Sequence, residues 1–290
     1  MNQSLSARIQ EKMSGFSKGQ RLIAKYIEEH YDKVAFMTAS RLGATVGVSE
    51  STVVRFATEI GYAGYPDLQQ AMQAMIRNKL TSVQRMEVTA DRIGDSDVLE
   101  SVLNHDIELI RRTMEETPHE DFYHAVDAIV ESRNIYILGV RSSQSLASFL
   151  AYYFSLIFEN VKQVNASSEA EIFEQMLRVN EHDTVIGISF PRYSKKAVKA
   201  LQFASKRGAR VIALTDSAVS PIAEPADYVL LAKSDMASIV DSLVAPLSMI
   251  NALVVTTALK KRDEVTKVFS SLENIWEDYG VYEKVDGHTN

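Results

Sequence analysis

The chain has 290 residues, a formal net charge of −7 and no cysteine. Its length exceeds that of one typical domain of roughly 100 to 200 residues, so we expect two domains. Without cysteine there is no disulfide, no thiolate metal site and no cysteine nucleophile, which suits a reducing cytoplasm. No apolar run resembles a signal peptide or reaches the ~20 residues of a membrane span, so we expect a cytoplasmic protein with no membrane partner.

Charge is divided unevenly along the chain. Residues 1–80 contain ten Lys or Arg against seven Asp or Glu, whereas residues 81–290 contain 21 against 31. The first segment is therefore mildly basic and the second is acidic. A surplus of three positive charges permits nucleic-acid binding by the first segment without establishing it.

Helical periodicity dominates the first 130 residues, and the segment RLGATVGVSESTVVRF at 41–56 contains two helix starts. Thr38 can cap a helix that begins at Ala39, and Ser49 can cap the next. Gly47 supplies the tight turn between them. The pattern predicts a helix-turn-helix whose second helix enters the major groove of DNA.

The second helix presents polar side chains outward near its N-terminal end. Arg55 is expected to contact a base or a phosphate, and Ser51 and Thr52 to hold phosphates. The alternative interpretation is a helical hairpin with a solvated second helix. The expected DNA-binding residues are Thr38, Ser49, Glu50, Ser51, Thr52 and Arg55.

The segment Leu80–Asp97 is polar and weakly periodic, which places an inter-domain linker there. Helical patterns resume at Val98–Met114 and Phe122–Glu131. From Asn134 onward, short β-rich runs alternate with helical segments, which predicts parallel βαβ units and a doubly wound sheet. The five runs are IYILGV, VKQVNA, TVIGISF, VIALTD and YVLLA. Two more helices are expected at about Ser238–Lys260 and at Glu264–Trp276.

Two polar loops follow predicted strands and lead directly into helices: GVRSSQS at 139–145 and SFPRYSKK at 189–196. Such loops aim backbone N–H groups, hydroxyls and a helix dipole at one anion, in the crevice beyond the carboxyl ends of parallel strands. Lys195 and Lys196 lie at the unfavourable end of a helix dipole, at ~0.3 to 1 kcal/mol each, unless an anion compensates. In the alternative interpretation the serines only cap helices and the lysines point into water.

The segment STVVRFATEIGYAGYPDL resembles the N-terminal module of the RpiR family of bacterial transcriptional regulators. The serine loops and LTDSAVSPIAEPADYVLLA are similar to the sugar isomerase (SIS) domain that follows this module. The resemblance implies a recognition helix containing Ser49, Thr52, Val53, Arg55 and Phe56. It also implies phosphate-binding serines Ser142, Ser143 and Ser145 in the first loop and Ser189 and Ser194 in the second. The second loop departs from the usual Ser-Gly-x-Thr pattern with Pro191-Arg192-Tyr193, so Arg192 is expected to provide part of the phosphate contact.

The fold class expected is an all-α helix-turn-helix head followed by an α/β domain with a doubly wound, five-stranded parallel sheet. The predicted domains are a DNA-binding domain at 1–80, a linker and connecting helix at 81–119, a phosphosugar-binding SIS domain at 120–262, and a C-terminal helix and tail at 263–290.

Aldose–ketose isomerisation needs a positioned base, and none of the six histidines is convincing. Glu169 and Glu171 are the acidic candidates, and both are better explained by a solvated helix start. No metal motif and no cofactor motif is present, so we expect neither a catalytic residue nor a metal or cofactor site.

The sequence therefore predicts a regulator that binds double-stranded DNA, senses a phosphorylated sugar and thereby modulates operator binding at genes of carbohydrate metabolism. It is expected to form a homodimer or tetramer through the SIS domain. One alternative is a sugar-phosphate isomerase with a helical oligomerisation head. Another is a DNA-binding protein whose crevice binds nothing.

Overall fold

The computed structural model describes residues 5–76, 81–93, 97–165, 168–236 and 239–283. The chain forms two compact units, each with its own core. Unit 1 consists of Met1–Ser101 and Met236–Val240, and unit 2 of Val102–Asp235 and Asp241–Asn290.

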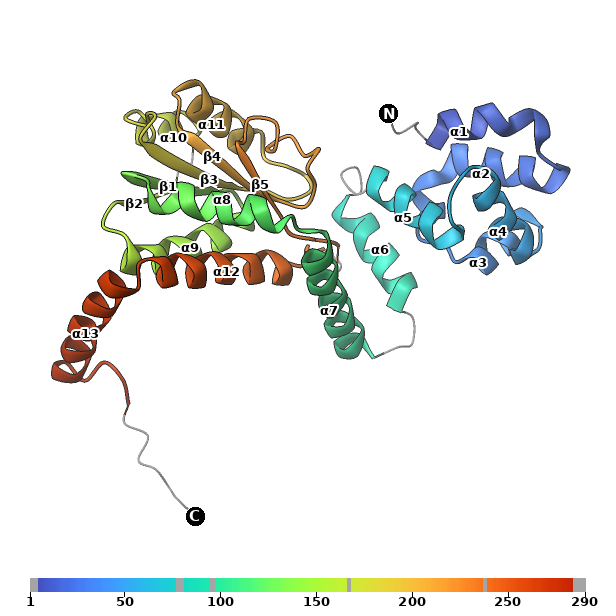
Figure 1. The fold of residues 1–290 in the computed structure, drawn as a ribbon. Helices are drawn as coiled ribbons and strands as arrows, with labels where there is room; N and C mark the ends of the chain where they lie inside the picture. The colour runs from blue at the N-terminus through green and yellow to red at the C-terminus, as the bar shows by residue number, and fades with distance from the viewer. Residues whose placement is uncertain (1–4, 77–80, 94–96, 166–167, 237–238, 284–290) are drawn as a thin grey trace, which may run out of the picture. The chain divides into compact units, whose positions relative to one another are not determined.

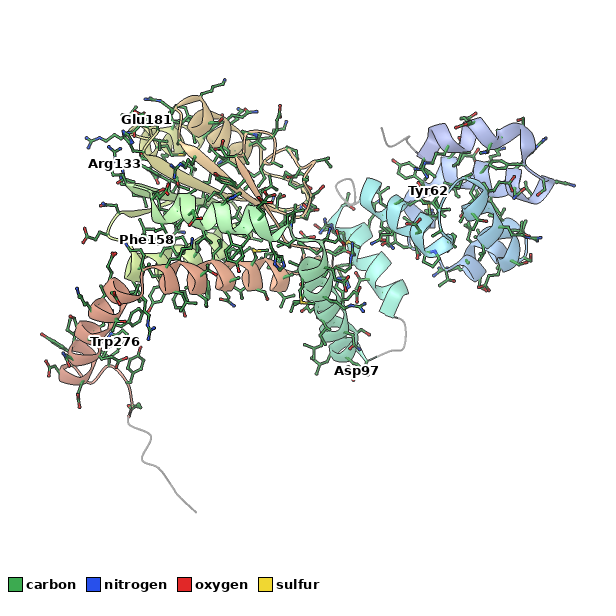
Figure 2. All side chains as sticks on the ribbon, viewed as in Figure 1. Tyr62, Asp97, Arg133, Phe158, Glu181 and Trp276 are labelled. Atoms are coloured by element: carbon green, nitrogen blue, oxygen red, sulfur yellow. The ribbon has the colours of Figure 1, made fainter. Side chains whose placement is uncertain are left out.

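The regular elements described between residues 5 and 93 in unit 1 are all helices (Figure 1). Its helices are α1 (Leu5–Lys12), the 3-10 helix η1 (Met13–Gly15), α2 (Lys18–Val34), α3 (Ala39–Val46), α4 (Glu50–Glu59), α5 (Tyr65–Ile76) and α6 (Ser82–Ile93). Ile23, Leu42, Val53 and Phe56 are fully buried in its core. Tyr62, in the turn between α4 and α5, packs against the same cluster (Figure 2).

Helix α6 lies where the sequence predicted a linker. The apolar pattern did not reveal its packed face, because the buried residues Arg85 and Thr89 are polar whereas Val83 and Met86 are exposed. Leu80 and residues 94–96, at the ends of the expected linker, lie outside the described residues. Residues 82–93 of the expected linker segment are therefore helical, which the sequence analysis did not predict.

Unit 2 contains a five-stranded, all-parallel sheet, as the sequence predicted. Its strand order is β2-β1-β3-β4-β5. The strands are β1 (Asn134–Gly139), β2 (Val161–Val164), β3 (Asp183–Ile188), β4 (Arg210–Thr215) and β5 (Tyr228–Leu231). The helices are α7 (Val98–Glu116), which begins in unit 1, α8 (His119–Val130), α9 (Ser143–Ile157), α10 (Glu169–Gln175), α11 (Lys195–Lys206), α12 (Val244–Lys260) and α13 (Arg262–Asp278).

Helices cover both faces of this sheet. Side chains of β1 alternate between the faces: Ile135 and Ile137 join the core shared with α8, α9 and α12, whereas Tyr136 and Leu138 join the core shared with α10 and α11. Figure 1 shows the two helical layers on either side of the strands. The strand order reverses between β1 and β3. From β1 the chain continues to β2 on one side of it, and from β2 it crosses to β3 on the other side of β1.

Helix α12 begins later than the sequence predicted. The expected start, Ser238, lies outside the described residues, and the helix begins at Val244. Before it, the backbone N–H of Ser242 donates to the carbonyl of Asp235, and the Ser242 hydroxyl donates to Asp106 on α7. These non-local hydrogen bonds hold the segment in a non-helical conformation, which apolar periodicity alone does not reveal.

Candidate functional site

The turn of the helix-turn-helix is built around two glycines. Gly47, at φ 80°, ends α3 in the left-handed conformation. The N–H groups of Gly47 and Val48 both donate to the carbonyl of Gly43 at 2.8 Å. A Cβ on Gly43 would lie 2.8 Å from the Val48 carbonyl oxygen, so any larger residue would force the backbone to shift. Sequence reasoning identified Gly47 but missed Gly43, whose importance depends on how closely the start of α4 approaches α3.

The N-terminus of α4 is fixed by its own side chains. The Ser49 hydroxyl accepts the N–H of Thr52 and lies 2.9 Å from the Ser51 hydroxyl and 2.8 Å from the Thr52 hydroxyl. Thr38 caps α3 in the same way, accepting the N–H of Arg41. Both predicted caps are therefore present, and they set the direction of the two helices.

The outer face of α4 carries the predicted DNA-binding side chains. Glu50, Ser51 and Arg55 are exposed and Thr52 is half-buried, whereas Val53 on the opposite face is fully buried. The Arg55 Nε donates to the Ser51 carbonyl at 3.2 Å, and the residue is exposed. An exposed arginine near the start of a capped helix can form a bidentate contact with guanine or a phosphate.

The first serine loop leaves β1 at Gly139. A Cβ on this glycine would lie 2.2 Å from the Ser143 carbonyl oxygen, so the chain can turn into α9 only with glycine here. Ser142 and Ser145 are exposed and Ser143 is buried. Ser142 occupies the N-cap position of α9, but among the described residues its hydroxyl makes no capping hydrogen bond. The hydroxyl of Ser142 is therefore not explained by helix capping.

The second serine loop leaves β3 at Ile188. The buried Ser189 accepts the N–H of Ser194 through its Oγ at 3.2 Å, and this hydrogen bond closes the loop. Ser194 then caps α11, accepting the N–H of Ala197. Arg192 is exposed and has a left-handed backbone, with φ 62°. Lys195, in the first turn of α11, is also exposed.

Both loops start at the same edge of the sheet. Gly139 and Ile188, the last residues of β1 and β3, are direct partners in the parallel pairing. Neighbouring strands lie about 4.8 Å apart, so the two loops leave the sheet side by side. Strand order reverses between these strands, which is where open α/β sheets bind ligands. The arrangement offers an anion two serine loops and two helix N-termini, those of α9 and α11.

A third loop is tied to this pair. The Tyr193 hydroxyl donates to Asp216 Oδ1 at 2.8 Å, and Asp216 directly follows β4. The contact joins the second serine loop to the neighbouring strand end. Sequence reasoning treated Tyr193 only as a departure from the family pattern, because nothing in the local sequence indicates a partner 23 residues away.

The acidic candidates have structural partners. Glu171 Oε2 accepts the N–H of Ser168, whose hydroxyl accepts the N–H of Glu171 in return, which makes a capping box for α10. Glu169 forms an ion pair with Lys199 of α11 at 2.6 Å. These contacts explain both carboxylates without a role in proton transfer.

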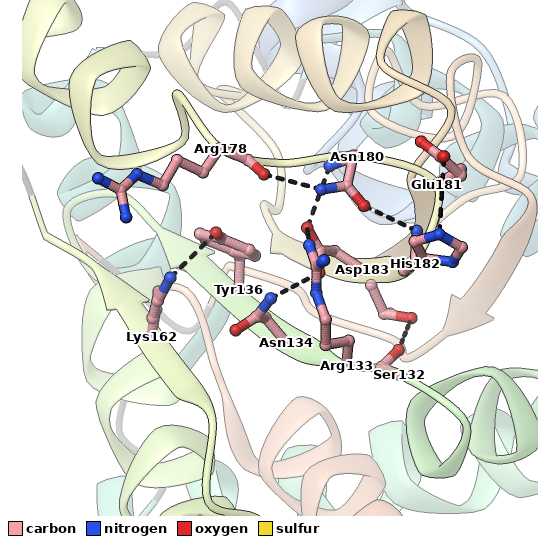
Figure 3. Close-up of polar contacts among 11 residues, drawn as sticks. Ser132, Arg133, Asn134, Tyr136, Lys162, Arg178, Asn180, Glu181, His182 and Asp183 are labelled. Atoms are coloured by element: carbon pink, nitrogen blue, oxygen red, sulfur yellow. Dashed lines mark hydrogen bonds and ion pairs between the residues drawn. The ribbon is translucent and has the colours of Figure 1, made fainter.

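A polar cluster occupies the opposite edge of the sheet, around the amino ends of β1 and β3 (Figure 3). The fully buried Asp183 carboxylate accepts hydrogen bonds from the side chains of Arg133 and Asn134 and from the backbone N–H of Asn180. His182 lies in this cluster, exposed and beside Glu181. This histidine is therefore far from the serine loops along the strands, as its place before β3 predicted.

Within the described ranges, no three His, Cys, Asp or Glu side chains gather closely enough to hold a metal ion. No described helix is long and apolar enough to cross a membrane.

Comparisons with known proteins agree with this architecture. Residues 3–79 match the helix-turn-helix domain of the rpiR family, and residues 128–256 match the SIS domain. An HTH-type transcriptional regulator of Caldanaerobacter subterraneus is 25% identical over 93% of this chain and 95% of its own length. The structure of NanR of Vibrio vulnificus, complexed with ManNAc-6P, covers 95% of this chain and 99% of its own, with a TM-score of 0.58 and 21% identity.

A second solved structure resembles unit 2 more closely in sequence. The sugar isomerase domain of an RpiR transcription factor from Sphaerobacter thermophilus covers 60% of this chain and 97% of its own, at 28% identity and a TM-score of 0.57. The head and the sheet domain thus each match the corresponding part of one kind of regulator, in the same order. The chain belongs to the RpiR family of helix-turn-helix transcriptional regulators with a SIS domain.

Proposed function

We propose that this regulator binds operator DNA through α4 and senses a phosphorylated sugar at the two serine loops, controlling genes of carbohydrate metabolism. The observation that carries the proposal is the pairing of Gly139 with Ile188, which starts two serine loops side by side in a chain that also has an exposed, capped α4. NanR, which shares the fold, holds a sugar phosphate in its own structure.

The proposed DNA contacts follow from exposure on α4 and the cap of α3. Arg55 provides the base or phosphate contact, and the hydroxyl groups at the start of α4 hold phosphates. The proposed DNA-binding residues are Thr38, Ser49, Glu50, Ser51, Thr52 and Arg55. Two heads of a homodimer would meet two half-sites about 34–36 Å apart. Each head has only a modest positive charge, but two heads together make twice as many phosphate contacts.

The proposed phosphate contacts come from both serine loops. A dianionic phosphate at this edge accepts hydrogen bonds from hydroxyls and backbone N–H groups. Its negative charge also compensates the unfavourable electrostatic interaction of Lys195 with the helix N-terminus. The proposed ligand-binding residues are Ser142, Ser143, Ser145, Ser189, Arg192 and Ser194. Since the acidic candidates are engaged in a cap and an ion pair, we infer sensing rather than isomerisation.

DNA binding is tested with Arg55→Ala and DNA selected by the wild-type protein from a random pool. Lys25→Ala is the matched control, because it removes one positive charge from a 72% exposed side chain on α2. We expect loss of about 1–3 kcal/mol of binding free energy per head for Arg55→Ala and little change for the control. Equal affinities of the two variants would contradict the role of α4.

Ligand sensing is tested by thermal shift with hexose, amino-sugar and pentose phosphates, and with inorganic phosphate and unphosphorylated sugars beside them. A ligand at 100 times its Kd stabilises by about 2.7 kcal/mol. Ser189→Ala should reduce the shift, whereas Ser205→Ala, on the exposed surface of α11, should not. If no sugar phosphate shifts the melting temperature, the alternative of a crevice that binds nothing is favoured.

A further inference from the structure

Each serine loop contains an arginine with an unfavourable backbone conformation. Arg141 and Arg192 are the two non-glycine residues with a positive φ among the described residues, at 59° and 62°. This conformation is unfavourable because it brings the Cβ close to the following carbonyl oxygen. Asparagine and aspartate tolerate it through local hydrogen bonds of their short side chains, which arginine does not have. A strained arginine in each of two neighbouring loops therefore needs an explanation beyond the turns themselves.

Both arginines lie close to the same edge of the sheet. Arg141 is two residues beyond the end of β1, and Arg192 is four residues beyond the end of β3. The last residues of these strands, Gly139 and Ile188, are direct partners. Hydrogen bonds keep both loops short: the N–H of Gln144 donates to the Arg141 carbonyl at 3.0 Å, and the second loop is closed by its own serine. Two long side chains can therefore reach one ligand at this edge.

The guanidinium of Arg141 is available to a ligand. The residue is exposed, and within the described part of the chain its side chain forms no hydrogen bond, ion pair or ring contact. Its N–H donors form a rigid planar fork that fits the paired oxygens of a carboxylate or phosphate. Strained residues are retained where the surrounding structure fixes them, and they cluster at ligand-binding sites. Arg192 is already among the proposed ligand-binding residues, and these observations add Arg141.

The positive charge of the two loops exceeds what one phosphate needs. The cations of segments 139–145 and 189–196 are Arg141, Arg192, Lys195 and Lys196, and neither segment contains an acidic residue. Asp216, hydrogen-bonded to the second loop, offsets one of these charges. The two glutamates at the start of α10 are already engaged in an ion pair and a cap. The N-termini of α9 and α11 add about half a positive charge each. About four positive charges thus face the roughly two negative charges of a phosphate group.

We propose that the ligand carries a second anionic group, a carboxylate or a second phosphate, and that Arg141 and Arg192 hold this group. The inference rests on the proposed function, in which the serines and the two helix N-termini hold the first phosphate. The two guanidinium groups then bind the other end of the sugar through parallel N–H···O hydrogen bonds. The ligand class is therefore a phosphorylated sugar acid or a sugar bisphosphate, rather than a neutral sugar with one phosphate.

The second anionic group is tested by calorimetry on the full chain. Glucose 6-phosphate is measured beside 6-phosphogluconate and glucose 1,6-bisphosphate, and amino-sugar and pentose phosphates are measured beside their C1 acids and 1-phosphates. In at least one set, we expect a doubly anionic ligand to bind about tenfold or more tightly than its parent monophosphate, because charge-assisted hydrogen bonds are added. The tighter of the acid and the bisphosphate identifies the second group.

The role of Arg141 is tested with Arg141→Gly, which removes the guanidinium and also relieves the backbone strain. We expect about tenfold weaker binding of the doubly anionic ligand and a change of less than about twofold for the monophosphate. The melting temperature of the free protein should equal or exceed that of the wild type. Ser189→Ala, in contrast, should weaken both ligands equally.

Arg207→Ala is the matched control, because it removes an exposed arginine at the other end of α11, about 18 Å from the loop for a 12-residue helix. The guanidinium of Arg207 lies over the ring of Phe203, and its loss should change neither affinity.

Three results would overturn this inference while leaving the proposed function intact. In the first, monophosphates bind as tightly as every acid and bisphosphate. In the second, Arg141→Gly weakens both classes of ligand to the same extent, which would place Arg141 on the single phosphate. In the third, Arg141→Gly lowers the melting temperature of the free protein and leaves both affinities unchanged, which would make the role of Arg141 structural. If no sugar phosphate of any kind binds, the proposed function fails, and this inference fails with it.

Discussion

Replacing Gly43 with alanine should impair DNA binding more than folding. The new Cβ would lie 2.8 Å from the Val48 carbonyl oxygen, 0.6 Å closer than the 3.4 Å at which ordinary contact begins. This clash can be relieved only if the backbone before Ser49 moves, and α4 would move with that backbone. Overpacking lowers the free energy of unfolding by about 1–3 kcal/mol. Replacing glycine with alanine inside a helix raises it by about 1 kcal/mol, so the net loss of stability is about 0–2 kcal/mol. A displacement above about 0.5 Å exceeds the tolerance of a binding site.

The assay is anisotropy with DNA selected by the wild-type protein, combined with thermal melts of each variant. Gly15→Ala is the matched control, because a Cβ at Gly15 meets nothing within 4 Å. We expect wild-type affinity for the control and at least a tenfold loss for Gly43→Ala, with both proteins folded. Wild-type affinity of Gly43→Ala would refute the argument that this turn positions α4 for DNA.

Three further predictions concern unit 2. Asp183→Ala should lower the free energy of unfolding by about 3 kcal/mol in chemical denaturation, because it removes a buried acceptor from three donors. Tyr193→Phe removes the hydrogen bond to Asp216 and should weaken sugar-phosphate affinity about fivefold by calorimetry. Burial raises the pKa of Glu116, but the hydrogen bonds and positive charges of Lys233 and Arg112 together outweigh this effect and leave the pKa below the ordinary 4.5. The ionised Glu116 therefore stabilises the folded state above pH 4.5, and this stabilisation is lost as pH falls through the lowered pKa. Glu116→Gln should make the melting temperature depend less on pH in this acidic range.

The sheet and the helix-turn-helix were predictable because their signals are local. Each strand is a short β-rich run, and the caps at Thr38 and Ser49 are single residues next to the helices they start. The reversal of strand order was not visible, but any parallel sheet places the ends of β1 and β3 at one edge. The approximate position of the two serine loops therefore followed from the sequence.

The features that escaped prediction depend on contacts between distant residues. Arg85 occupies a buried position on α6 that apolar periodicity cannot recognise. The start of α12 is set by hydrogen bonds from Ser242 to Asp235 and to α7. The need for glycine at position 43 comes from the approach of the next helix, which is a tertiary distance and not a sequence pattern.

Residues 236–240, in the connection between β5 and α12, belong to unit 1, and Met236 is buried in its core. The head is therefore assembled from two stretches of chain more than 130 residues apart. A fragment that stops at residue 101 would have a hole where this methionine sits, and it is a poor choice for isolated expression.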